Sequence, residues 1–289
     1  SSTSRGLGDV YKRQSMNFAP NLDFTQCLLP ADQASSLPPS CYTSAGVVQS
    51  EVETIFRQSW IGVGRADMVP KSGNYITLNF AEQQIILLRD TKRKLRAFAN
   101  VCRHRGARLL DGQGDCKGIR CPFHSWFYGL DGRLISAPHM EKIKEFDKAQ
   151  NGLIPYRAEE RLGFVFVCLN HDTPDLDTIL GDLEKIHAPW PIETLVSVRR
   201  QETIVDCNWK MFIEVFNEYY HLPFVHPNTV DSIYGAPEPV DEVIGAFATQ
   251  FGTTEGTGGL LETTQDNALP HMPGLSNYAA TGARYTWVF

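Results

Sequence analysis

Two cysteines and two histidines in the first half of the chain have the types and spacing of metal ligands. Cys102 is followed after one residue by His104. Sixteen residues separate His104 from Cys121, which is followed after two residues by His124. Each short motif therefore supplies one sulfur and one imidazole nitrogen. This set suits a two-iron cluster with thiolates on one iron and neutral imidazoles on the other, the arrangement known as Rieske ligation.

The same four side chains could also bind a structural zinc ion, because two thiolates and two imidazoles form a common tetrahedral set. Zinc fingers usually pair cysteine with cysteine and histidine with histidine, whereas each motif here mixes the two. The ligand order therefore favours the iron–sulfur cluster. Cys116, between the motifs, is interpreted as an uncoordinated thiol. The remaining cysteines are interpreted as packing residues: Cys27, Cys41, Cys168 and Cys207.

A second group of candidate ligands lies about a hundred residues downstream, in NWKMFIEVFNEYYHLPFVH at 208–226. Glu218 is followed three residues later by His221, and five residues after that by His226. Two histidines with one carboxylate form the facial triad that leaves open positions on Fe(II) for dioxygen. The stretch is predicted to be a helix that Pro223 interrupts, so that the two imidazoles converge through a local distortion.

A rival interpretation of this region is a di-iron helical bundle. Glu184 and His187 repeat the Glu-x-x-His spacing of Glu218 and His221, which is a signature of such bundles. That fold needs four long helices and two further glutamates, whereas this chain is dense in strand patterns and prolines. His187 is therefore predicted to lie at a helix end ahead of Pro189.

Short segments rich in β-branched and aromatic residues surround the first group of ligands. They are NYITLNF, QQIILLRD, LRAFANVC and GFVFVCLN. This pattern predicts a small antiparallel β domain. Ahead of it, SEVETIFRQSW is predicted to be a helix capped by Ser50 and Glu53, preceded by an irregular surface arm.

The composition changes near Pro174, where a second unit is predicted to begin. The segment TPDLDTILGDLEKI carries apolar residues at helical spacing, and VRRQETIVDC and ARYTWVF have strand character. The second unit therefore mixes helices with strands.

The overall composition excludes several classes of protein. The chain has 289 residues, 21% of them charged, and a formal net charge of −6. Because it has no run of lysine and arginine, nucleic acid is not an expected partner. No apolar run approaches about eighteen residues, so neither membrane insertion nor export is indicated and a cytoplasmic location is expected. The seven cysteines favour reduced thiols or metal ligands over a disulfide framework.

The residues around both groups resemble a single family. FANVCRHRGARLL followed by CPFHSWFYGLDGRL is similar to the Rieske domain of the α subunits of Rieske non-haem iron, or aromatic ring-hydroxylating, oxygenases. The run NWK…E…NEYYH…H resembles the catalytic domain of the same family. Two departures are Glu218, where most members have aspartate, and Val215, which replaces an asparagine. The longer acid resembles the branch that acts on quaternary ammonium compounds such as carnitine and glycine betaine.

The resemblance implies a role for each candidate residue. The four residues of the first group would hold a [2Fe–2S] cluster, and His221 and His226 would bind a mononuclear Fe(II). Glu218 would be a bridging acid that links His221 to His124 of the partner subunit. The third iron ligand, a carboxylate, lies far downstream of the second histidine in the family.

The chain is expected to be a fragment. Residues 1–14, SSTSRGLGDVYKRQ, end in a string that a common sequencing adaptor encodes and are expected to be an artefact. The chain ends in RYTWVF, an apolar run typical of a strand interior. The third ligand is therefore expected to be missing and the chain alone to be inactive; Asp231 and Asp266 are interpreted as surface loop residues.

The predicted fold class is α+β. An N-terminal arm and helix at 15–56 precede an all-β Rieske [2Fe–2S] domain at 57–172, and 173–289 form part of a helix-grip catalytic domain with an antiparallel sheet. The resemblance implies a terminal oxygenase that uses O₂ on a small organic substrate, leaning to monooxygenation or N-dealkylation of a quaternary ammonium compound. Dioxygenation of an aromatic ring or aromatic acid is the alternative.

The resemblance also implies partners. The chain lacks the G-x-G-x-x-G pattern of a dinucleotide site, so a separate NAD(P)H-dependent reductase or ferredoxin is expected. A homo-oligomer, a trimer in this family, is expected because electrons would cross between subunits. An alternative of another class is a Rieske electron-transfer protein without oxygenase activity, which would not need the stretch at 208–226.

Overall fold

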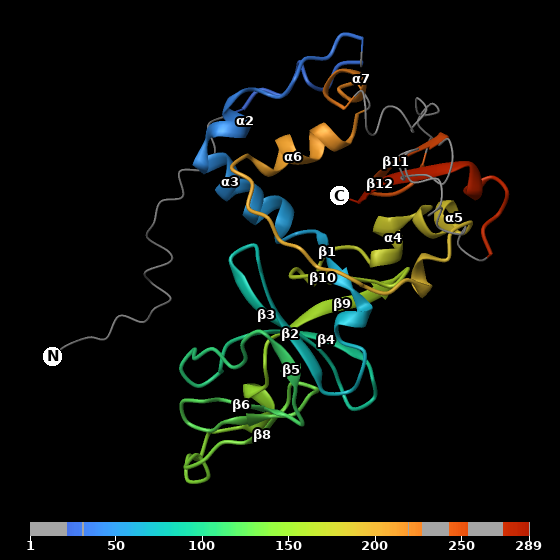
Figure 1. Cartoon of the computed structure of the whole chain (residues 1–289). Coiled ribbons are helices and arrows are strands. Elements are labelled where there is room, and N and C mark those ends of the chain that lie inside the picture. Colours follow the sequence, from blue (N-terminus) through green and yellow to red (C-terminus); the bar gives the residue numbers. More distant parts are fainter. Residues whose placement is uncertain (1–21, 31, 219, 227–242, 254–273, 289) are drawn as a thin grey trace.

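The computed structural model describes an α+β protein, as predicted (Figure 1). A β domain occupies the middle of the chain, and short helices with a two-stranded sheet lie beyond one end of it (Figure 1). No helix in the described part is both long and apolar enough to cross a bilayer. The described residues are 22–30, 32–218, 220–226, 243–253 and 274–288.

The β domain is built on one antiparallel sheet in the order β1-β10-β9-β4-β3-β2-β5. All four segments predicted as strands belong to it, so that prediction is confirmed. Tyr75 of β2 faces Leu88 of β3, and Ile85 of β3 faces Ala99 of β4, as expected of hairpins. The strands are β1 (Trp60–Arg65), β2 (Asn74–Phe80), β3 (Gln83–Arg89), β4 (Leu95–Ala99), β5 (Gln113–Asp115), β9 (Pro155–Arg161) and β10 (Phe164–Cys168).

The inner strand β3 is apolar on both sides because both faces of the sheet are covered. Ile86 and Leu88 point into one core, and Ile85 and Leu87 point into another; all four are fully buried. Successive side chains of a strand face opposite sides of its sheet, so burial on both faces requires a continuous apolar run. The segment QQIILLR meets this requirement.

A three-stranded sheet of β6 (Ile119–Arg120), β7 (Phe127–Tyr128) and β8 (Leu134–Ser136) projects from the lower end of the β domain (Figure 1). The turn between β7 and β8 needs glycine at position 132. Gly132 has φ +84°, and a Cβ there would lie 2.5 Å from the ring of Phe98. Residues other than glycine are strained at this φ, so the GLDGRL sequence fits the turn.

The helical region before the β domain differs from the predicted one. Helix α2 (Ser40–Thr43) is followed by α3 (Ala45–Glu51), which continues into the π-helical turn η1 (Val52–Phe56). Ser50 therefore lies inside the helix rather than at its start, and the proposed cap was wrong. Glu53 instead pairs with Arg57 at 2.5 Å, one turn further on. The 3₁₀ turn η2 (Ala66–Met68) follows β1.

The amphipathic segment after Pro174 forms two short helices, α4 (Leu176–Leu180) and α5 (Leu183–His187). Gly181 separates them with φ +49°, and its Cβ position is blocked by the carbonyl oxygen of Ile244. A left-handed residue ends an α-helix, so the single predicted helix is broken. His187 does lie at a helix end, as predicted.

The predicted strand at 198–207 is wrong. The chain is extended there but pairs with no strand in the described part, and Val198 and Ile204 are 93 and 95% exposed. Strand character alone does not form a strand, because the backbone groups need a neighbouring strand to bond. The predicted strand at the end of the chain is confirmed as β12 (Gly282–Val288), which pairs with β11 (Phe247–Thr253).

A third apolar core joins the β domain to the elements that follow it. Trp60 and Phe166 of the large sheet pack there with Phe247 of β11 and the leucines of α4 and α5. The remaining helical elements are η3 (Lys148–Asn151), η4 (Ile192–Thr194), α6 (Trp209–Phe216), α7 (Leu222–Val225) and η6 (Ala279–Thr281). The domain boundaries predicted from the sequence stay predictions.

The cysteines outside the ligand motifs do not all pack in a core. Cys41 and Cys168 are buried, as predicted, and Cys27 is half-buried. Cys207 is exposed, so its assignment as a packing residue was wrong. It is the last residue of the segment 198–207, and no element of the described part covers it.

Candidate metal centres

The first cysteine–histidine motif lies in a tight loop that follows β4. The backbone N–H of Cys102 donates to the carbonyl of Ala107 at 2.8 Å, and its carbonyl accepts from the N–H of Gly106 at 2.9 Å. Gly106 has φ +72°, the left-handed conformation that glycine adopts without strain. Two backbone hydrogen bonds therefore fix Cys102 at the start of the loop.

The second motif repeats this construction between β6 and β7. The N–H of Cys121 donates to the carbonyl of Trp126 at 2.8 Å, and its carbonyl accepts from the N–H of Ser125 at 3.1 Å. Ser125 stands four residues after the cysteine, as Gly106 does, and also has a positive φ of 57°. Both thiols are thus presented by loops with the same backbone hydrogen bonds.

The two thiols lie inside the protein. Cys102 and Cys121 are 3 and 2% exposed and belong to one core cluster. The hydroxyl of Tyr128 lies 3.3 Å from Sγ of Cys102 and accepts a hydrogen bond from the N–H of Arg103 at 3.1 Å. Burial raises the pKa of the Cys102 thiol, and the contact with Tyr128 opposes that rise.

The two imidazoles lie close together above this core. The ring centroids of His104 and His124 are 4.7 Å apart, and His104 stacks on Trp126 at 5.0 Å and 9°. Burial lowers the pKa of His104, and the neighbouring imidazole of His124 adds to this effect. The lowered pKa of His104 favours its neutral imidazole, which is the form that binds metals.

One feature of these histidines tests whether the site fits a metal cluster. The Nδ1 atoms of His104 and His124 are both buried and have no hydrogen-bond partner. Buried polar atoms are almost always paired, so two adjacent orphaned nitrogens beside two buried thiols call for a missing partner. A Rieske cluster supplies it, because two imidazoles bind one of its irons and two thiolates the other.

Within the described ranges, no group of three or more His, Cys, Asp or Glu side chains is placed to hold one metal ion. A Rieske cluster does not need such a group, since each of its irons takes only two protein ligands.

The second candidate centre lies at the end of α6. Asn208 caps this helix, its side chain accepting from the N–H of Lys210 at 3.1 Å. The helix ends at Phe216, and a new helix, α7, begins after His221. Pro223 lies in the first turn of α7, where proline is tolerated, so it does not cause the break as predicted. The distortion lies before His221.

Glu218 and His221 meet in this break. Oε2 of Glu218 accepts from the N–H of His221 at 3.0 Å, and Oε1 contacts Nδ1 of the same residue. Partial burial raises the pKa of Glu218, but the hydrogen bonds from His221 outweigh it, so the pKa lies below its usual range. The carboxylate thus occupies Nδ1 and leaves Nε2 as the imidazole nitrogen for another partner.

His226, the third candidate in this region, lies close to His221. The rings of His221 and His226 have centroids 5.6 Å apart at 75°. The structure therefore brings Glu218, His221 and His226 together. Asp231 and Asp266, the available carboxylates, lie outside the described residues.

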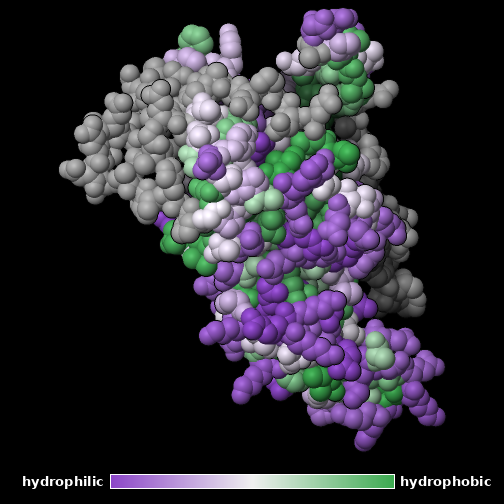
Figure 2. Space-filling view, turned by 90° about the vertical axis from the view of Figure 1, so that its right-hand side faces the viewer, coloured by the Kyte–Doolittle hydropathy of each residue, from purple (hydrophilic) through white to green (hydrophobic). Residues whose placement is uncertain are grey.

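The two candidate centres lie at opposite ends of the molecule. The loops of the first lie beside β6–β8 at the lower end of Figure 1, and α6 and α7 lie at the upper end. Mainly hydrophilic residues cover the lower end, with hydrophobic ones between them (Figure 2). Phe123, whose ring contacts that of His124, is 61% exposed.

Two contacting residues of the first centre were missed in the sequence. The hydroxyl of Tyr128 contacts the sulfur of Cys102, and the ring of Trp126 stacks on that of His104. Both residues lie within CPFHSWFYG, beside the second motif. The alternation of side chains between the two faces of β7 was a possible signal that Tyr128 points inward, because Tyr128 is fully buried while Phe127 is not. No local pattern indicates which sulfur the hydroxyl reaches.

Comparisons with known proteins cover both centres. Residues 59–147 match the family model of the Rieske [2Fe-2S] domain, and residues 187–289 match that of the ring hydroxylating alpha subunit (catalytic domain). The first match contains both cysteine–histidine motifs, and the second contains the stretch at 208–226. Residues 22–58 lie outside both.

Similar proteins include two curated oxygenase subunits. The chain is 35% identical over 205 residues to the carnitine monooxygenase oxygenase subunit of Acinetobacter baumannii, covering 70% of this chain and 55% of that protein. It is 35% identical over 199 residues to the glycine betaine monooxygenase oxygenase subunit of Chromohalobacter salexigens, covering 68 and 44%. The chain thus spans about half the length of these relatives.

A solved structure is also similar. It is that of a quaternary ammonium Rieske monooxygenase, described as giving insights into carnitine oxidation and inter-subunit electron transfer. The TM-score is 0.72 at 31% identity, covering 79% of this chain and 64% of that one.

Proposed function

Because the chain belongs to the family of Rieske ring-hydroxylating oxygenase α subunits, we propose that it is part of a terminal oxygenase for quaternary ammonium compounds. The observation that carries the oxygenase function is the contact of Glu218 with His221, with His226 beside it. An electron-transfer protein that uses only the cluster has no need of this second centre. The match to the catalytic-domain model over the same residues supports the oxygenase.

The substrate class follows from the relatives and from Glu218. Two similar proteins are named for carnitine and glycine betaine, both of which carry a trimethylammonium group. We propose monooxygenation of such a compound, with loss of an N-alkyl fragment as the outcome. The alternative product class is the hydroxylated ring of an aromatic compound.

The four residues of the first centre would hold the cluster. Cys102 and Cys121 would bind one iron as thiolates, and His104 and His124 would bind the other through their unpartnered Nδ1 atoms. Tyr128 would donate a hydrogen bond to the sulfur of Cys102, which favours the reduced cluster because reduction adds negative charge. The buried core around both loops would keep water from the sulfurs.

His221 and His226 would be the protein's imidazole ligands to mononuclear iron, with a carboxylate as the third ligand. When bound, the cluster would supply single electrons and the mononuclear iron would activate dioxygen. Glu218 holds the His221 ring through Nδ1, and its low pKa keeps it a carboxylate at neutral pH. It therefore fixes both the tautomer and the orientation of that imidazole.

A homo-oligomer follows from the placement of the two centres at opposite ends of one chain (Figure 1). We propose that Glu218 also contacts His124 of the partner subunit, so that electrons cross between subunits. A trimer closes such a head-to-tail contact into a ring. An NAD(P)H-dependent reductase or a ferredoxin would be the external donor.

The test uses the whole protein that contains this chain, loaded with both metal groups. Oxygen uptake is measured with carnitine, glycine betaine and an aromatic acid. Replacing His221 with alanine should lower carnitine- or betaine-dependent uptake by at least about a hundredfold while the cluster absorption spectrum stays unchanged. The matched control is His139→Ala, an exposed loop histidine. Unchanged uptake in His221→Ala would overturn the assignment, and uptake only with the aromatic acid would overturn the substrate class.

A further inference from the structure

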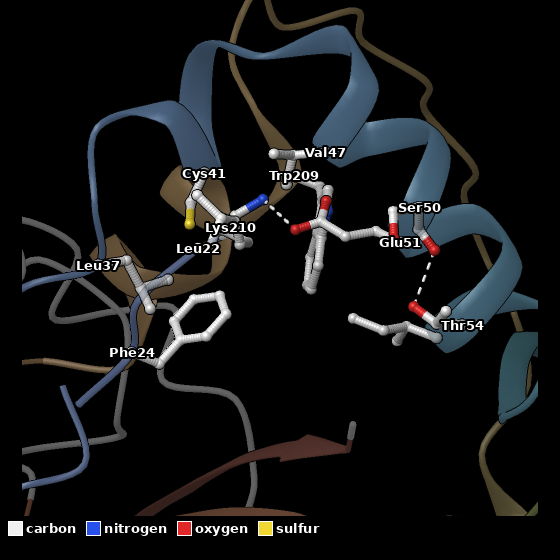
Figure 3. Close-up of a pocket in the computed structure, with 11 residues that line it drawn as sticks. Leu22, Phe24, Leu37, Cys41, Val47, Ser50, Glu51, Thr54, Trp209 and Lys210 are labelled. Carbon is white, nitrogen blue, oxygen red and sulfur yellow. Dashed lines mark hydrogen bonds and ion pairs between the residues drawn. The ribbon is translucent and has the colours of Figure 1, made fainter. Parts of the chain in front are cut away.

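The helices that precede the β domain hold α6 by buried polar contacts. The carboxylate of Glu51, at the end of α3, accepts from Nζ of Lys210 at 2.6 Å and from Nε1 of Trp209 at 2.8 Å. The side chains of Glu51 and Lys210 are only 12 and 10% exposed. Figure 3 shows the two pointing toward each other, with Trp209 beside them. Both partners belong to the first turn of α6.

A second contact holds the same helix one turn later. The hydroxyl of Tyr42, in α2, donates to Oε1 of Glu214 at 2.8 Å. Burial, and then this hydrogen bond, raise the pKa of Tyr42 to about 12, so it stays a donor throughout the neutral range. Nζ of Lys210 also lies 5.7 Å from the centroid of the Tyr42 ring. Residues 40–51 thus bond to both halves of α6.

Apolar packing alone does not fix α6 on this side. A cavity of about 470 Å³ opens beside the Glu51–Lys210 pair, lined by apolar side chains that include Phe24, Leu37 and Val47 (Figure 3). A gap of this size leaves side chains without close contacts on one side. The hydrogen bonds of Glu51 therefore hold the first turn of α6 to the end of α3, beside the ring contact of Phe56 with Trp209. A buried ion pair is suited to this, because it specifies one geometry more than it adds stability.

The position of α6 decides the position of the iron-binding segment. The helix has eight residues and ends at Phe216, and Glu218 follows two residues later. The contact between Glu218 and His221 joins residues only three apart, and none of the described residues between α6 and α7 belongs to a helix or strand, so α6 is the nearest regular element that places this pair. A shift of α6 would move Glu218 and, with it, the imidazole that it orients.

We propose that Glu51 and Tyr42 are positioning residues for the mononuclear iron centre, acting through α6. They lie outside both matched domains, which begin at residues 59 and 187. The proposal rests on the proposed function only in naming iron as the metal. Neither residue touches the cluster loops, so the cluster and the iron centre should respond differently to their replacement.

The experiment replaces Glu51 with glutamine and Tyr42 with phenylalanine in the whole protein. Glutamine keeps a carbonyl oxygen for Trp209 but removes the charge that pairs with Lys210. The matched control is Glu53→Gln, because Glu53 lies on the same helical segment and is ion-paired, but with Arg57 rather than with α6. Three readouts are taken: Fe(II) affinity of the mononuclear centre, amide hydrogen exchange of peptides spanning 217–226, and the cluster spectrum.

Glu51→Gln should weaken Fe(II) binding and lower kcat by about ten- to a hundredfold, since misplacement of a site by about 1 Å has effects of this size. Amide exchange at 217–226 should become faster while the cluster spectrum stays as in the wild type. Tyr42→Phe should change Fe(II) affinity, kcat and amide exchange in the same directions by smaller amounts. Glu53→Gln should leave all three as in the wild type. Because Tyr42→Phe removes a single hydroxyl, it tests the proposal even where Glu51→Gln fails to fold.

Two results would overturn the proposal. One is a lower Tm in Glu51→Gln or Tyr42→Phe with unchanged Fe(II) affinity and unchanged exchange at 217–226, which indicates a purely structural role. The other is equal effects in Glu53→Gln. Failure of the proposed function is distinguishable, because it shows as wild-type protein without substrate-dependent oxygen uptake, whereas exchange and metal affinity do not depend on the substrate.

Discussion

The residues of the two candidate centres are held in different ways. Cys102 and Cys121 are almost fully buried, and each is fixed by two backbone hydrogen bonds within its own loop. Glu218 and His221 keep 39 and 23% of their side chains exposed and lie in a break between two short helices. A redox cluster benefits from a fixed, water-poor surrounding, whereas an iron that binds substrate and oxygen needs open positions.

The difference also concerns how far each centre depends on distant residues. The backbone hydrogen bonds that fix the two cysteines of the first centre join residues at most five apart in the sequence, and Tyr128 lies 26 residues from Cys102. Glu218 and His221 of the second candidate centre follow α6, which bonds to Glu51 from 158 and 159 residues away along the chain. The first centre is therefore expected to tolerate changes elsewhere better than the second.

The largest expected effect is that of Cys121→Ser. A serine hydroxyl is a poor ligand for iron in a site built for thiolate, so the cluster absorption should be lost and oxygen uptake of the whole protein should fall to background. Fe(II) affinity of the mononuclear centre should stay within about twofold if the two centres are independent. The control is Cys116→Ser, a half-buried thiol nearby that should keep the full cluster content. Full cluster content in Cys121→Ser would contradict the ligand assignment.

A smaller effect is expected from Tyr128→Phe. The cluster should be retained, but its midpoint potential should fall by roughly 60 mV, the equivalent of tenfold for a one-electron couple, because a hydrogen bond to the Cys102 sulfur is removed. Potentiometric titration followed by the cluster spectrum measures this. Phe127→Leu is the neighbouring control, since that ring stacks with Arg120 rather than with a ligand. A potential equal to that of the wild type would show that the hydroxyl does not act on the sulfur.

The smallest expected effect is on the pH dependence of the free energy of unfolding, through His187 at the end of α5. Nδ1 of His187 donates to the carbonyl oxygen of Leu183, and its Nε2 contacts Oγ1 of Thr286, both at 2.8 Å. Burial lowers the pKa of this imidazole. The folded protein therefore disfavours the charged imidazole. Its contribution to stability should be complete above the unfolded value of about 6.5 and be lost as pH falls through the lower, folded pKa.

Replacing His187 with glutamine should flatten this pH dependence. The free energy of unfolding is measured by urea titration at about pH 7.5 and 5.5, and the difference between the two should be smaller in the variant. The exposed histidine His171, replaced in the same way, is the control. An equal pH dependence in His187→Gln and the wild type would show that this imidazole is not linked to stability.

Much of the molecule could be predicted from local sequence. The strands of the β domain follow from alternating or continuous apolar runs, and the two cysteine–histidine motifs stand out by spacing alone. Two of the failures share one cause. The predicted strand at 198–207 has no neighbouring strand in the described part, and the predicted helix after Pro174 breaks at Gly181, where the backbone of Ile244 approaches. Both outcomes depend on residues far away in the chain.

By itself, the sequence determined which side chains could bind metal, how far apart they stand along the chain and that strands surround the first group, because these depend on residue type and near neighbours. Only the tertiary structure decided that Tyr128 reaches the Cys102 sulfur, that two histidines have unpartnered Nδ1 atoms, and that Glu51 holds α6. These contacts arise when elements pack. Packing joins side chains that no local pattern connects.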